Sequence, residues 1–283
     1  MSGQLRLRVL TLNIWALPIP LPREDRAERM ARLPDALRSV DADIIMLQEA
    51  LHPRDRDAVV RALARDGYTA TATATRRLGG LLPMDASGGL LTLSRFPLDA
   101  ASYHPLPVPA GAKWTERMSG KGVLRCVVRT PLGPVTCVNV HLYAGTTPAD
   151  RAARLEQLHA APLEAAPGSL VTVLAGDLNA TVAASVDGMA VDGPEIVCLT
   201  GLGFRDVVRD GAPGSRLATY AVRSNRYAAM WADPARGDER LDFILYRPAG
   251  TTPIGVREVR VVFDESAALV SDHYGVQADL ALG

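Results

Sequence analysis

The stretch Leu170-Val-Thr-Val-Leu-Ala-Gly-Asp177-Leu-Asn179 passes from a Val- and Leu-rich run directly into an acid and an amide. A short apolar run of this kind is typical of a buried β-strand, which we expect over Leu170–Ala175. Polar side chains at the end of a packed strand are costly to bury unless they are paired or coordinated. The stretch therefore predicts a core strand that carries Asp177 and Asn179 at its carboxyl end.

The segments before this strand indicate how it enters a sheet. Two apolar runs, Val123–Arg129 and Val135–Val140, flank Pro131-Leu-Gly-Pro134, which is typical of a hairpin turn. A helix expected over Ala149–Ala160 then leads from the second run to Leu170–Ala175. Since antiparallel strands are joined by hairpins and parallel strands by helical crossovers, this order predicts a mixed sheet.

Two helices and six strands are expected in the rest of the chain. The first helix covers Arg26–Ser39, with Pro34 expected to kink or shorten it. The second helix is expected over Asp55–Arg65, and the strands over Leu5–Leu12, Asp43–Leu47, Gly89–Ser94, Leu241–Tyr246, Val256–Phe263 and Tyr274–Leu280. Because strands outnumber helices, we expect an α/β sandwich in which two mixed sheets pack face to face with helices outside.

Composition limits the class of protein. The chain has 283 residues, of which 48% are hydrophobic, and no low-complexity linker or internal repeat divides it. We therefore expect a single domain over residues 1–283. Lys and Arg number 31, as do Asp and Glu, so the formal net charge is zero. Nucleic-acid-binding proteins usually present a basic face, so this balance disfavours nucleic acid as substrate and leaves a local basic patch open.

Cysteine usage and the N-terminus bear on the compartment. Cys126 and Cys137 lie within apolar runs, and with Cys198 they make an odd number, so buried reduced thiols are favoured over disulfides or a metal site. No signal peptide precedes the first strand, and no segment reaches the roughly 18 apolar residues that span a bilayer. We expect a soluble, cytoplasmic protein, with export after removal of a leader, or without one, left open.

The most informative regularity is that strand after strand ends in a polar side chain. These residues are Asn13, Glu49, His141, Asp177 with Asn179, and Asp272 with His273. Singly, each has a local explanation, such as a turn residue or the neighbour of a helix start. If the strand ends converge at one edge, however, they form a cluster of carboxylates, amides and imidazoles. Such hard ligands suit Mg²⁺ or Mn²⁺ rather than structural zinc, and a histidine beside them could activate water.

The same residues carry a resemblance to a known family. The motifs, in chain order, are Thr11-Leu-Asn13, Leu47-Gln-Glu49, Asn139-Val-His141-Leu, Gly176-Asp177-Leu-Asn179, Arg240-Leu-Asp242-Phe-Ile-Leu and Ser271-Asp272-His273. As a set they resemble the endonuclease/exonuclease/phosphatase superfamily from about Leu7 to Leu280. The resemblance implies a four-layered α/β sandwich and Mg²⁺-dependent hydrolysis of a phosphodiester or phosphomonoester, with Mn²⁺ expected to substitute.

The resemblance also implies a role for each residue. Glu49 matches the principal Mg²⁺ ligand, with Asn13 beside it. Asp177 and Asn179 match the pair that contacts the scissile phosphate, the water or a second metal ion. The number of metal ions in turnover stays open.

The histidines would perform the proton chemistry. His273 matches the general base for the attacking water, oriented by Asp272, and His141 matches the donor to the phosphate oxygens in the transition state. Asp242 matches a strand aspartate that supports the two histidines from behind.

Three further stretches resemble the neutral sphingomyelinase branch, which is of the phospholipase C type. They are Asn13-Ile-Trp15-Ala-Leu-Pro18 followed by Arg26-Ala-Glu-Arg-Met30, then Ser119-Gly-Lys121-Gly-Val-Leu124, and Thr219–Tyr227 before Glu239-Arg-Leu-Asp242. A lysine between glycines can approach a phosphate closely, so Lys121 is a candidate substrate-binding residue. The alternative is a hairpin turn with a solvated lysine.

These resemblances predict hydrolysis of a sphingomyelin-like phospholipid to phosphocholine and ceramide. No aromatic-tipped hairpin or C-terminal membrane span is evident, and the apolar stretches Trp15–Leu21 and Leu78–Met84 could contact lipid or pack inside. A nuclease acting on DNA or RNA is the first alternative, and a catalytically inactive binding protein on the same fold is the second. The partners expected are thus a phosphodiester substrate, preferably a phospholipid headgroup, and a peripheral membrane contact. No obligate protein partner is indicated, and the oligomeric state stays open.

Overall fold

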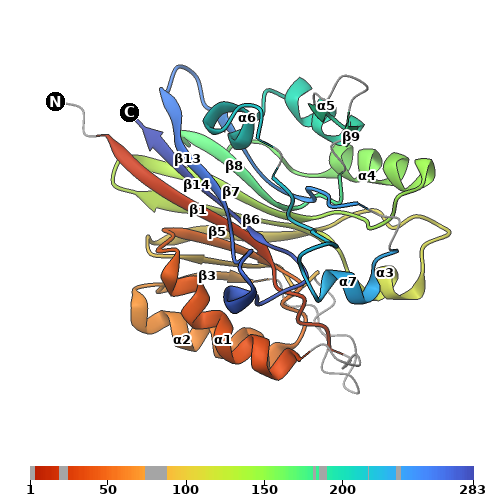
Figure 1. Cartoon of the computed structure of the whole chain (residues 1–283). Helices are drawn as coiled ribbons and strands as arrows, with labels where there is room; N and C mark the ends of the chain where they lie inside the picture. The colour runs from red at the N-terminus through yellow and green to blue at the C-terminus, as the bar shows by residue number, and fades with distance from the viewer. Residues whose placement is uncertain are drawn as a thin grey trace.

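Two six-stranded sheets packed against each other form the centre of the protein, and helices lie on the outside (Figure 1). The computed structural model describes residues 4–18, 25–73, 88–180, 183–184, 190–215, 217–233 and 237–283. The expected stretch Leu78–Met84 and the end of Trp15–Leu21 lie outside the described residues. Both sheets are mixed, as predicted.

The first sheet has the order β13-β14-β1-β2-β4-β3. Its strands are β1 (Leu5–Asn13), β2 (Ile44–Gln48), β3 (Ala70–Thr73), β4 (Leu91–Ser94), β13 (Ile254–Val262) and β14 (Gly275–Leu282). β1 runs parallel to β2 and antiparallel to β14. The two ends of the chain are therefore joined side by side in the middle of one sheet.

The second sheet has the order β11-β12-β8-β7-β6-β5. Its strands are β5 (Leu98–Pro105), β6 (Gly122–Thr130), β7 (Gly133–His141), β8 (Val171–Asp177), β11 (Arg205–Asp206) and β12 (Asp242–Pro248). β6 and β7 form the expected hairpin, and β7 runs parallel to β8 through the helical crossover. A separate two-stranded ribbon pairs β9 (Ala183–Ala184) with β10 (Ala190–Val191).

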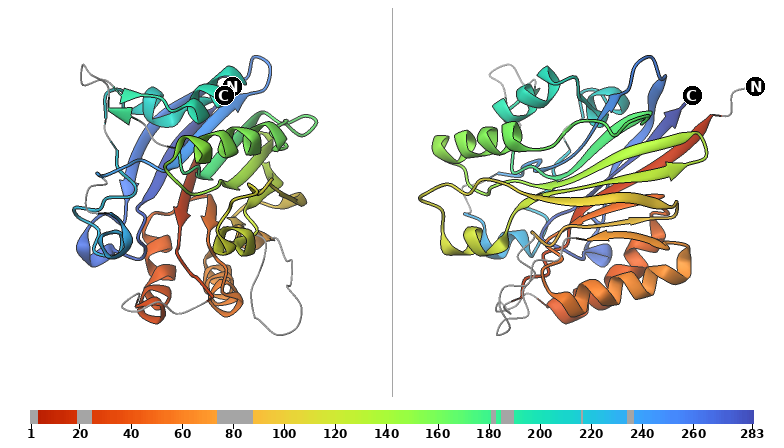
Figure 2. Two further views of the ribbon diagram at one scale, coloured as in Figure 1. Left: turned by 90° about the vertical axis from the view of Figure 1, so that its right-hand side faces the viewer. Right: turned by 180° about the vertical axis from the view of Figure 1, so that it is seen from behind.

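Helices cover the outer face of each sheet (Figure 2). α1 (Arg26–Ser39) and α2 (Pro53–Leu63) pack on the first sheet, and α4 (Pro148–Ala160) and α5 (Pro194–Gly201) on the second. The shorter helices are α3 (Trp114–Ser119), α6 (Val207–Gly211), α7 (Ala228–Trp231), and the 3₁₀ turns η1 (Ala64–Asp66) and η2 (Ser266–Ala268). Within the described part of the chain, no helix is long and apolar enough to cross a membrane.

Three apolar cores separate these layers. The central core lies between the sheets and includes Leu7, Val9, Ile44, Met46, Cys126, Cys137, Val173 and Ile244, all fully buried. The other two lie beneath α1 with α2 and beneath α4 with α5. The four-layered α/β sandwich is confirmed. Cys126 and Cys137 face each other across β6 and β7 as buried free thiols, as predicted, and Cys198 is a free, partly buried thiol.

The strands that carry the polar residues run further than expected. β1, β7 and β8 continue to Asn13, His141 and Asp177 themselves. Gly176 makes this register feasible, because a Cβ built there, at φ 152°, would lie 1.8 Å from the carbonyl oxygen of Val140. Only glycine lets β7 and β8 approach so closely, and this approach sets His141 directly opposite Asp177.

The expected shortening of the first helix at Pro34 does not occur. α1 continues through Pro34 to Ser39. Leu33 and Leu37, on either side of the proline, are fully buried against the first sheet, and this packing outweighs the lost backbone hydrogen bond.

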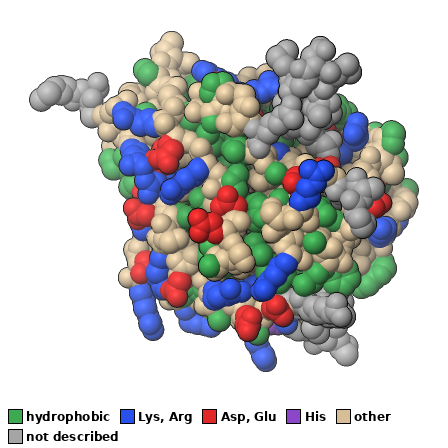
Figure 3. Space-filling model, in the orientation of Figure 1, with side chains coloured by type: hydrophobic (Ala, Val, Ile, Leu, Met, Phe, Trp, Pro, Cys, Tyr) green, Lys and Arg blue, Asp and Glu red, His purple; other side chains and the backbone are tan. Residues whose placement is uncertain are grey.

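Charged side chains of both signs are interspersed on the face drawn in Figure 3, in agreement with the zero net charge. A few large apolar side chains are nevertheless exposed in the described part of the chain. They are Val108, Trp114, Leu132, Val197, Leu202, Met230 and Trp231. The largest exposed fractions among the tryptophans are 62% for Trp114 on α3 and 51% for Trp231 on α7.

Candidate active site

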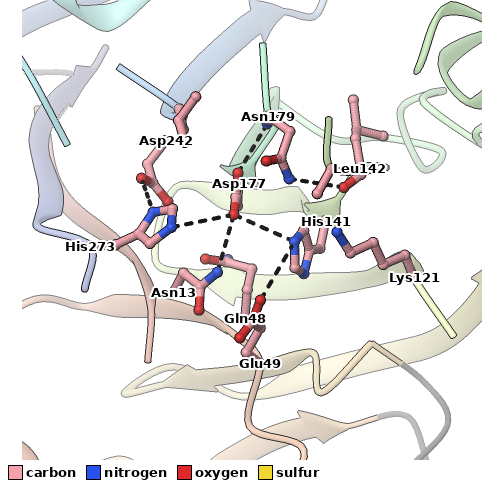
Figure 4. Close-up of polar contacts among 12 residues, drawn as sticks. Asn13, Gln48, Glu49, Lys121, His141, Leu142, Asp177, Asn179, Asp242 and His273 are labelled. Carbon is pink, nitrogen blue, oxygen red and sulfur yellow. Dashed lines mark hydrogen bonds and ion pairs between the residues drawn. The ribbon is translucent and has the colours of Figure 1, made fainter. Parts of the chain in front are cut away.

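Polar residues from both sheets converge at one end of the sandwich (Figure 4). Asn13 ends β1, Glu49 directly follows β2, and His141 and Asp177 end the parallel strands β7 and β8. Asp242 begins β12, which is antiparallel to β8, so it pairs with Asp177 at the same edge. The predicted convergence of strand ends is therefore present, and the ends of two sheets build one site.

Asp177 lies at the centre of the cluster. Its Oδ2 accepts a hydrogen bond from Asn13 Nδ2 at 3.1 Å and lies 3.4 Å from His141 Nε2 and 3.9 Å from His273 Nε2. Burial raises the pKa of Asp177, but the nearby His141, His273 and Lys121 outweigh burial and leave the pKa below its usual value. The Asp177 side chain is thus held as a carboxylate that links both sheets.

His273 is oriented by a carboxylate from the neighbouring strand. Its Nδ1 lies 2.7 Å from Oδ2 of the fully buried Asp242. Burial lowers the pKa of His273, but Asp242 and Asp177 together raise it to about 10. The ring of Tyr220 packs at a tilt of 59° against the imidazole, and the ring centroids are 5.1 Å apart. Because Nδ1 is bound to Asp242, Nε2 is the ring nitrogen that faces the site.

The expectation that Asp272 orients His273 is wrong. Asp272 Oδ1 lies 3.1 Å from the hydroxyl of Ser271, while the His273 ring turns toward the start of β12. Antiparallel pairing delivers Asp242 to that position, so the sequence neighbour is not needed there. The negative charge of Asp272 acts without a hydrogen bond, because it helps to raise the pKa of both His273 and Glu49.

The surroundings of Glu49 disfavour the ionised form of its side chain. Its backbone is left-handed, with φ 55°, and its side chain is 19% exposed. Burial and, after it, the charge of Asp272 raise the pKa of Glu49 to about 7. Its Oε1 lies 3.9 Å from His141 Nε2, a contact drawn in Figure 4. Ionised Glu49 would be stabilised by additional positive charge close to it.

His141 and Lys121 complete the wall of the site opposite His273. Burial, followed by the charge of Lys121, lowers the pKa of His141 to about 3, so its imidazole is neutral. Lys121 follows Gly120 (φ 59°) at the start of β6, and its Nζ lies 3.1 Å from Glu116 Oε2. The side chain of Lys121 is only 6% exposed, which contradicts the alternative of a solvated lysine in a hairpin turn.

Asn179 lies in a local turn and also borders the site. Its backbone N–H donates to Asp177 Oδ1 at 2.9 Å, which is an Asx turn, and its own φ is 48°. Its Nδ2 donates to the carbonyl oxygen of Leu142 at 3.0 Å. The turn fixes the orientation of the Asp177 carboxylate and brings Asn179 to the edge of the cluster.

A buried pair of amides was not anticipated from the sequence. Gln48 Nε2 donates to Asn139 Oδ1 at 2.8 Å, and Asn139 Nδ2 donates to the carbonyl oxygens of Leu47 and Leu91 at 3.0 and 3.1 Å. Both side chains are fully buried between the sheets. Because Gln48 precedes Glu49 and Asn139 lies two residues before His141, this bridge fixes the two sheets beside the site. In the sequence, the signal for this pair is an amide residue inside each of two apolar strands.

The donor set fits a hard divalent cation. Ligand atoms of Asp177, Asp242 and His273 lie within 4.8 Å of one another, all buried. Asp242 Oδ2 is hydrogen-bonded to His273 Nδ1, however, so we assign this pair to the orientation of the imidazole. Glu49, Asn13 and Asp177 bring two carboxylates and an amide from the other side of the cluster. Since partial burial raises the pKa of Glu49, a nearby cation would offset the cost of ionising it.

Comparisons with known proteins agree with this geometry. A sequence model described as "Endonuclease/Exonuclease/phosphatase family" matches residues 10–273. A Drosophila melanogaster protein named "Putative neutral sphingomyelinase" is 27% identical over 296 residues, which cover 98% of this chain. The chain spans 61% of the length of that relative.

Solved structures share the fold at lower identity. Sphingomyelinase C from Streptomyces griseocarneus matches with a TM-score of 0.70 and 21% identity, over 97% of this chain and 99% of that one. A variant of beta toxin from Staphylococcus aureus with bound magnesium ions matches with a TM-score of 0.70 and 18% identity, over the same shares of the two chains. At these identities the likeness concerns the fold.

Proposed function

The chain belongs to the endonuclease/exonuclease/phosphatase family, and we propose that it is a phosphodiesterase that hydrolyses a sphingomyelin-like phospholipid with the help of Mg²⁺. The observation that carries the proposal is the pair of Asp242 and His273 facing Asp177, with Glu49 and His141 on the other side. This places an oriented imidazole, carboxylates and a neutral imidazole donor around one small space. Attack of water on a phosphodiester needs these groups.

His273 is the proposed general base. With Nδ1 hydrogen-bonded to Asp242, its Nε2 can accept the proton of a water molecule, and the Asp242 carboxylate then stabilises the imidazolium. The pKa of about 10 means that His273 starts as an imidazolium at neutral pH while the surrounding acids are uncompensated. Positive charge close to Asp177 would lower that pKa and free Nε2 for catalysis.

His141 and Lys121 are the proposed partners of the phosphate. The lowered pKa of His141 keeps it neutral, and its Nε2, which faces Asp177 and Glu49, can donate one hydrogen bond to a phosphate oxygen. Lys121 adds a positive charge behind it. Both stabilise the negative charge that grows on the phosphate oxygens as water attacks.

Glu49, with Asn13 and Asp177, would hold the Mg²⁺ ion. The bound ion would polarise the phosphate and compensate the acidic cluster. The magnesium ions bound to the beta toxin variant of the same fold and the oxygen donors of these residues support Mg²⁺, and Mn²⁺ is expected to substitute. Asn179 remains a candidate ligand or phosphate contact at the edge of the same cluster.

The proposal of a lipid substrate rests on sequence similarity and on the net charge of the chain. The similarity to a protein named as a neutral sphingomyelinase, together with the stretches around Trp15, Lys121 and Tyr220, favours phosphocholine and ceramide as products. The zero net charge favours lipid over nucleic acid.

A peripheral membrane contact is part of the proposal. Trp114 lies on α3, whose Glu116 binds Lys121, and Trp231 lies on α7, which follows Tyr227 beside Trp15. Both helices are at the end of the sandwich where the site lies (Figure 1). Exposed tryptophans favour the polar boundary of a membrane, so these two side chains are the proposed points of contact.

A substrate panel tests the function. The purified protein is incubated with labelled sphingomyelin, phosphatidylcholine, plasmid DNA, an abasic duplex and RNA, each with Mg²⁺ and with EDTA. We expect Mg²⁺-dependent release of phosphocholine from sphingomyelin, lost in His273→Ala and kept in His159→Ala, an exposed histidine on α4. Preferential cleavage of DNA or RNA would favour the nuclease alternative. Absence of any phosphoester hydrolysis with Mg²⁺ or Mn²⁺ would favour the binding protein.

A further inference from the structure

Arg29 is a charged residue on the buried face of a helix. It lies on α1 beside Met30, Leu33 and Leu37, and it is 0% exposed. Its guanidinium lies 4.6 Å from the centre of the Trp15 ring and 5.4 Å from that of Tyr227. A buried guanidinium is costly unless its N–H groups are satisfied, so the bonds it makes indicate why it is there.

Those bonds reach two segments that are far apart in the sequence. Nη1 donates to the carbonyl oxygens of Ile14 and Val270, both at 3.0 Å, and Nη2 donates to that of Trp15 at 2.9 Å. Ile14 and Trp15 directly follow Asn13, and Val270 lies three residues before His273. The hydroxyl of Ser271 closes the same junction by donating to the carbonyl oxygen of Asn13 at 2.6 Å.

We propose that Arg29 is a positioning residue that holds the segment carrying Asn13 and the segment carrying His273 at a fixed separation. The inference rests on the proposed function, because that separation is the distance between a ligand of the ion and the general base. In these contacts Arg29 binds backbone carbonyls and stacks on aromatic rings, so we assign its effect to the residues that it holds. Its charge also lowers the pKa of Asp272, and Arg29→Lys keeps that charge.

The chemistry of arginine suits this junction better than that of lysine. A planar guanidinium can donate to three carbonyls in two directions while its faces stack on Trp15 and Tyr227. A lysine ammonium keeps the charge, but it lacks the N–H groups that diverge in one plane and the flat faces that stack on aromatic rings. Arg29→Lys is therefore the informative variant, since it preserves charge and removes geometry. Arg29→Met removes both.

The experiment compares local exchange and turnover in Arg29→Lys, Arg29→Met and Arg32→Met. Arg32 is the control because it lies on the same helix and donates to the carbonyl oxygen of Glu28 in its own helix. Amide hydrogen exchange is followed at Ile14, Ala16 and Tyr274, whose N–H groups bond to Gln48, Glu49 and Thr219. Turnover is followed on bis(p-nitrophenyl) phosphate with Mg²⁺, and sphingomyelin is tested in parallel.

We expect exchange at these three amides to be about tenfold faster in both Arg29 variants, with exchange in β7 unchanged. We expect kcat to fall about 10- to 100-fold with KM within about threefold, because misplacement of reacting groups affects kcat. Arg32→Met should match the unaltered protein. Unchanged local exchange with unchanged kcat would overturn the proposal, as would a uniform rise in exchange over both sheets. If the unaltered protein hydrolyses no phosphodiester, the proposed function fails while the exchange measurement still decides whether Arg29 holds the two segments.

Discussion

Asp242 Oδ2 and His273 Nδ1 lie 2.7 Å apart, although 31 positions separate the two residues in the chain. This pair, and not the adjacent Asp272 with His273, orients the imidazole. We expect Asp242→Asn to lower kcat by about 10²- to 10⁴-fold, because an amide can donate to Nδ1 and stabilise the wrong tautomer. Asp272→Asn should lower kcat much less. Steady-state kinetics on sphingomyelin or a chromogenic diester compare the two, and equal losses would contradict the assignment.

Glu49 should destabilise the protein when no metal ion is bound. Its pKa of about 7 in the folded protein lies above the ordinary value of 4.5. The folded state therefore binds this proton more tightly, so stability contributed by protonated Glu49 is present below pH 4.5 and is lost as pH rises through about 7. Glu49→Gln should raise the free energy of unfolding in EDTA at pH 8 by up to about 3 kcal/mol and by little at pH 4.5.

Urea unfolding at the two pH values measures this difference. Glu156→Gln, an exposed position on α4, is the control and should change stability little at either pH. The same Glu49→Gln variant should lose the stabilisation that Mg²⁺ gives to the unaltered protein. A gain in stability that is equal at pH 4.5 and pH 8 would show that the charge of Glu49 is not its cause.

The sequence predicted the layers and the polar residues well, for a physical reason. Val- and Leu-rich strands bounded by turns are strong signals, and a polar side chain at the end of such a strand must be paired or coordinated. Hence Asn13, Glu49, His141, Asp177 and His273 could be identified before their spatial arrangement was known. β3 and β5 were missed because they lie at or near the sheet edges, and their sequences, ATAT and LDAASYHP, lack continuous apolar runs.

What could not be predicted is which polar residue pairs with which. Asp272 was favoured over Asp242 as the partner of His273 because it is adjacent in sequence, whereas the pairing of β8 with β12 decides the contact. Likewise Arg29 lies in the stretch Arg26–Met30 that resembles the neutral sphingomyelinase branch, but the sequence indicates no partner for its guanidinium. Its hydrogen bonds join the segments of Ile14 and Val270, which meet only in the folded chain.

Mg²⁺ affinity should depend on pH through Glu49. Because the ion binds the carboxylate and the pKa of Glu49 is about 7, the affinity should fall toward tenfold per pH unit as the pH is lowered below about 7. Above pH 8 the contribution of Glu49 should flatten, and a rise that continues there would report the proton that His273, with its pKa of about 10, gives up when the ion binds. Titration calorimetry, or the shift of the melting temperature with Mg²⁺ at pH 5.5, 6.5, 7.5 and 8.5, measures it. A constant affinity from pH 5.5 to 8.5 would exclude Glu49 as a ligand with this pKa.

The amide bridge between the sheets should show strong coupling. Gln48→Leu leaves buried Asn139 Oδ1 without its donor, so we expect a loss of about 1–3 kcal/mol in the free energy of unfolding. Asn139→Leu should cost at least as much, since two carbonyl oxygens lose a donor. In a double-mutant cycle the combined variant should be more stable than the sum of the single losses predicts. Simple additivity would indicate that the two amides do not act as a pair.

The exposed tryptophans should matter only when the substrate is in a membrane. We expect Trp114→Ala/Trp231→Ala to bind phosphatidylcholine–sphingomyelin vesicles at least about tenfold more weakly, since each tryptophan loses a large amphipathic contact. Hydrolysis of vesicle sphingomyelin should fall with binding, while hydrolysis of bis(p-nitrophenyl) phosphate should not change. Val197→Ala/Leu202→Ala, at exposed apolar positions in and just after α5, is the matched control and should bind vesicles normally. Equal losses on the vesicle and the soluble substrate would mean that the tryptophans support the site itself. If single-stranded DNA competed with vesicles for the unaltered protein and not for the tryptophan variant, the contact surface would instead favour a nucleic-acid substrate.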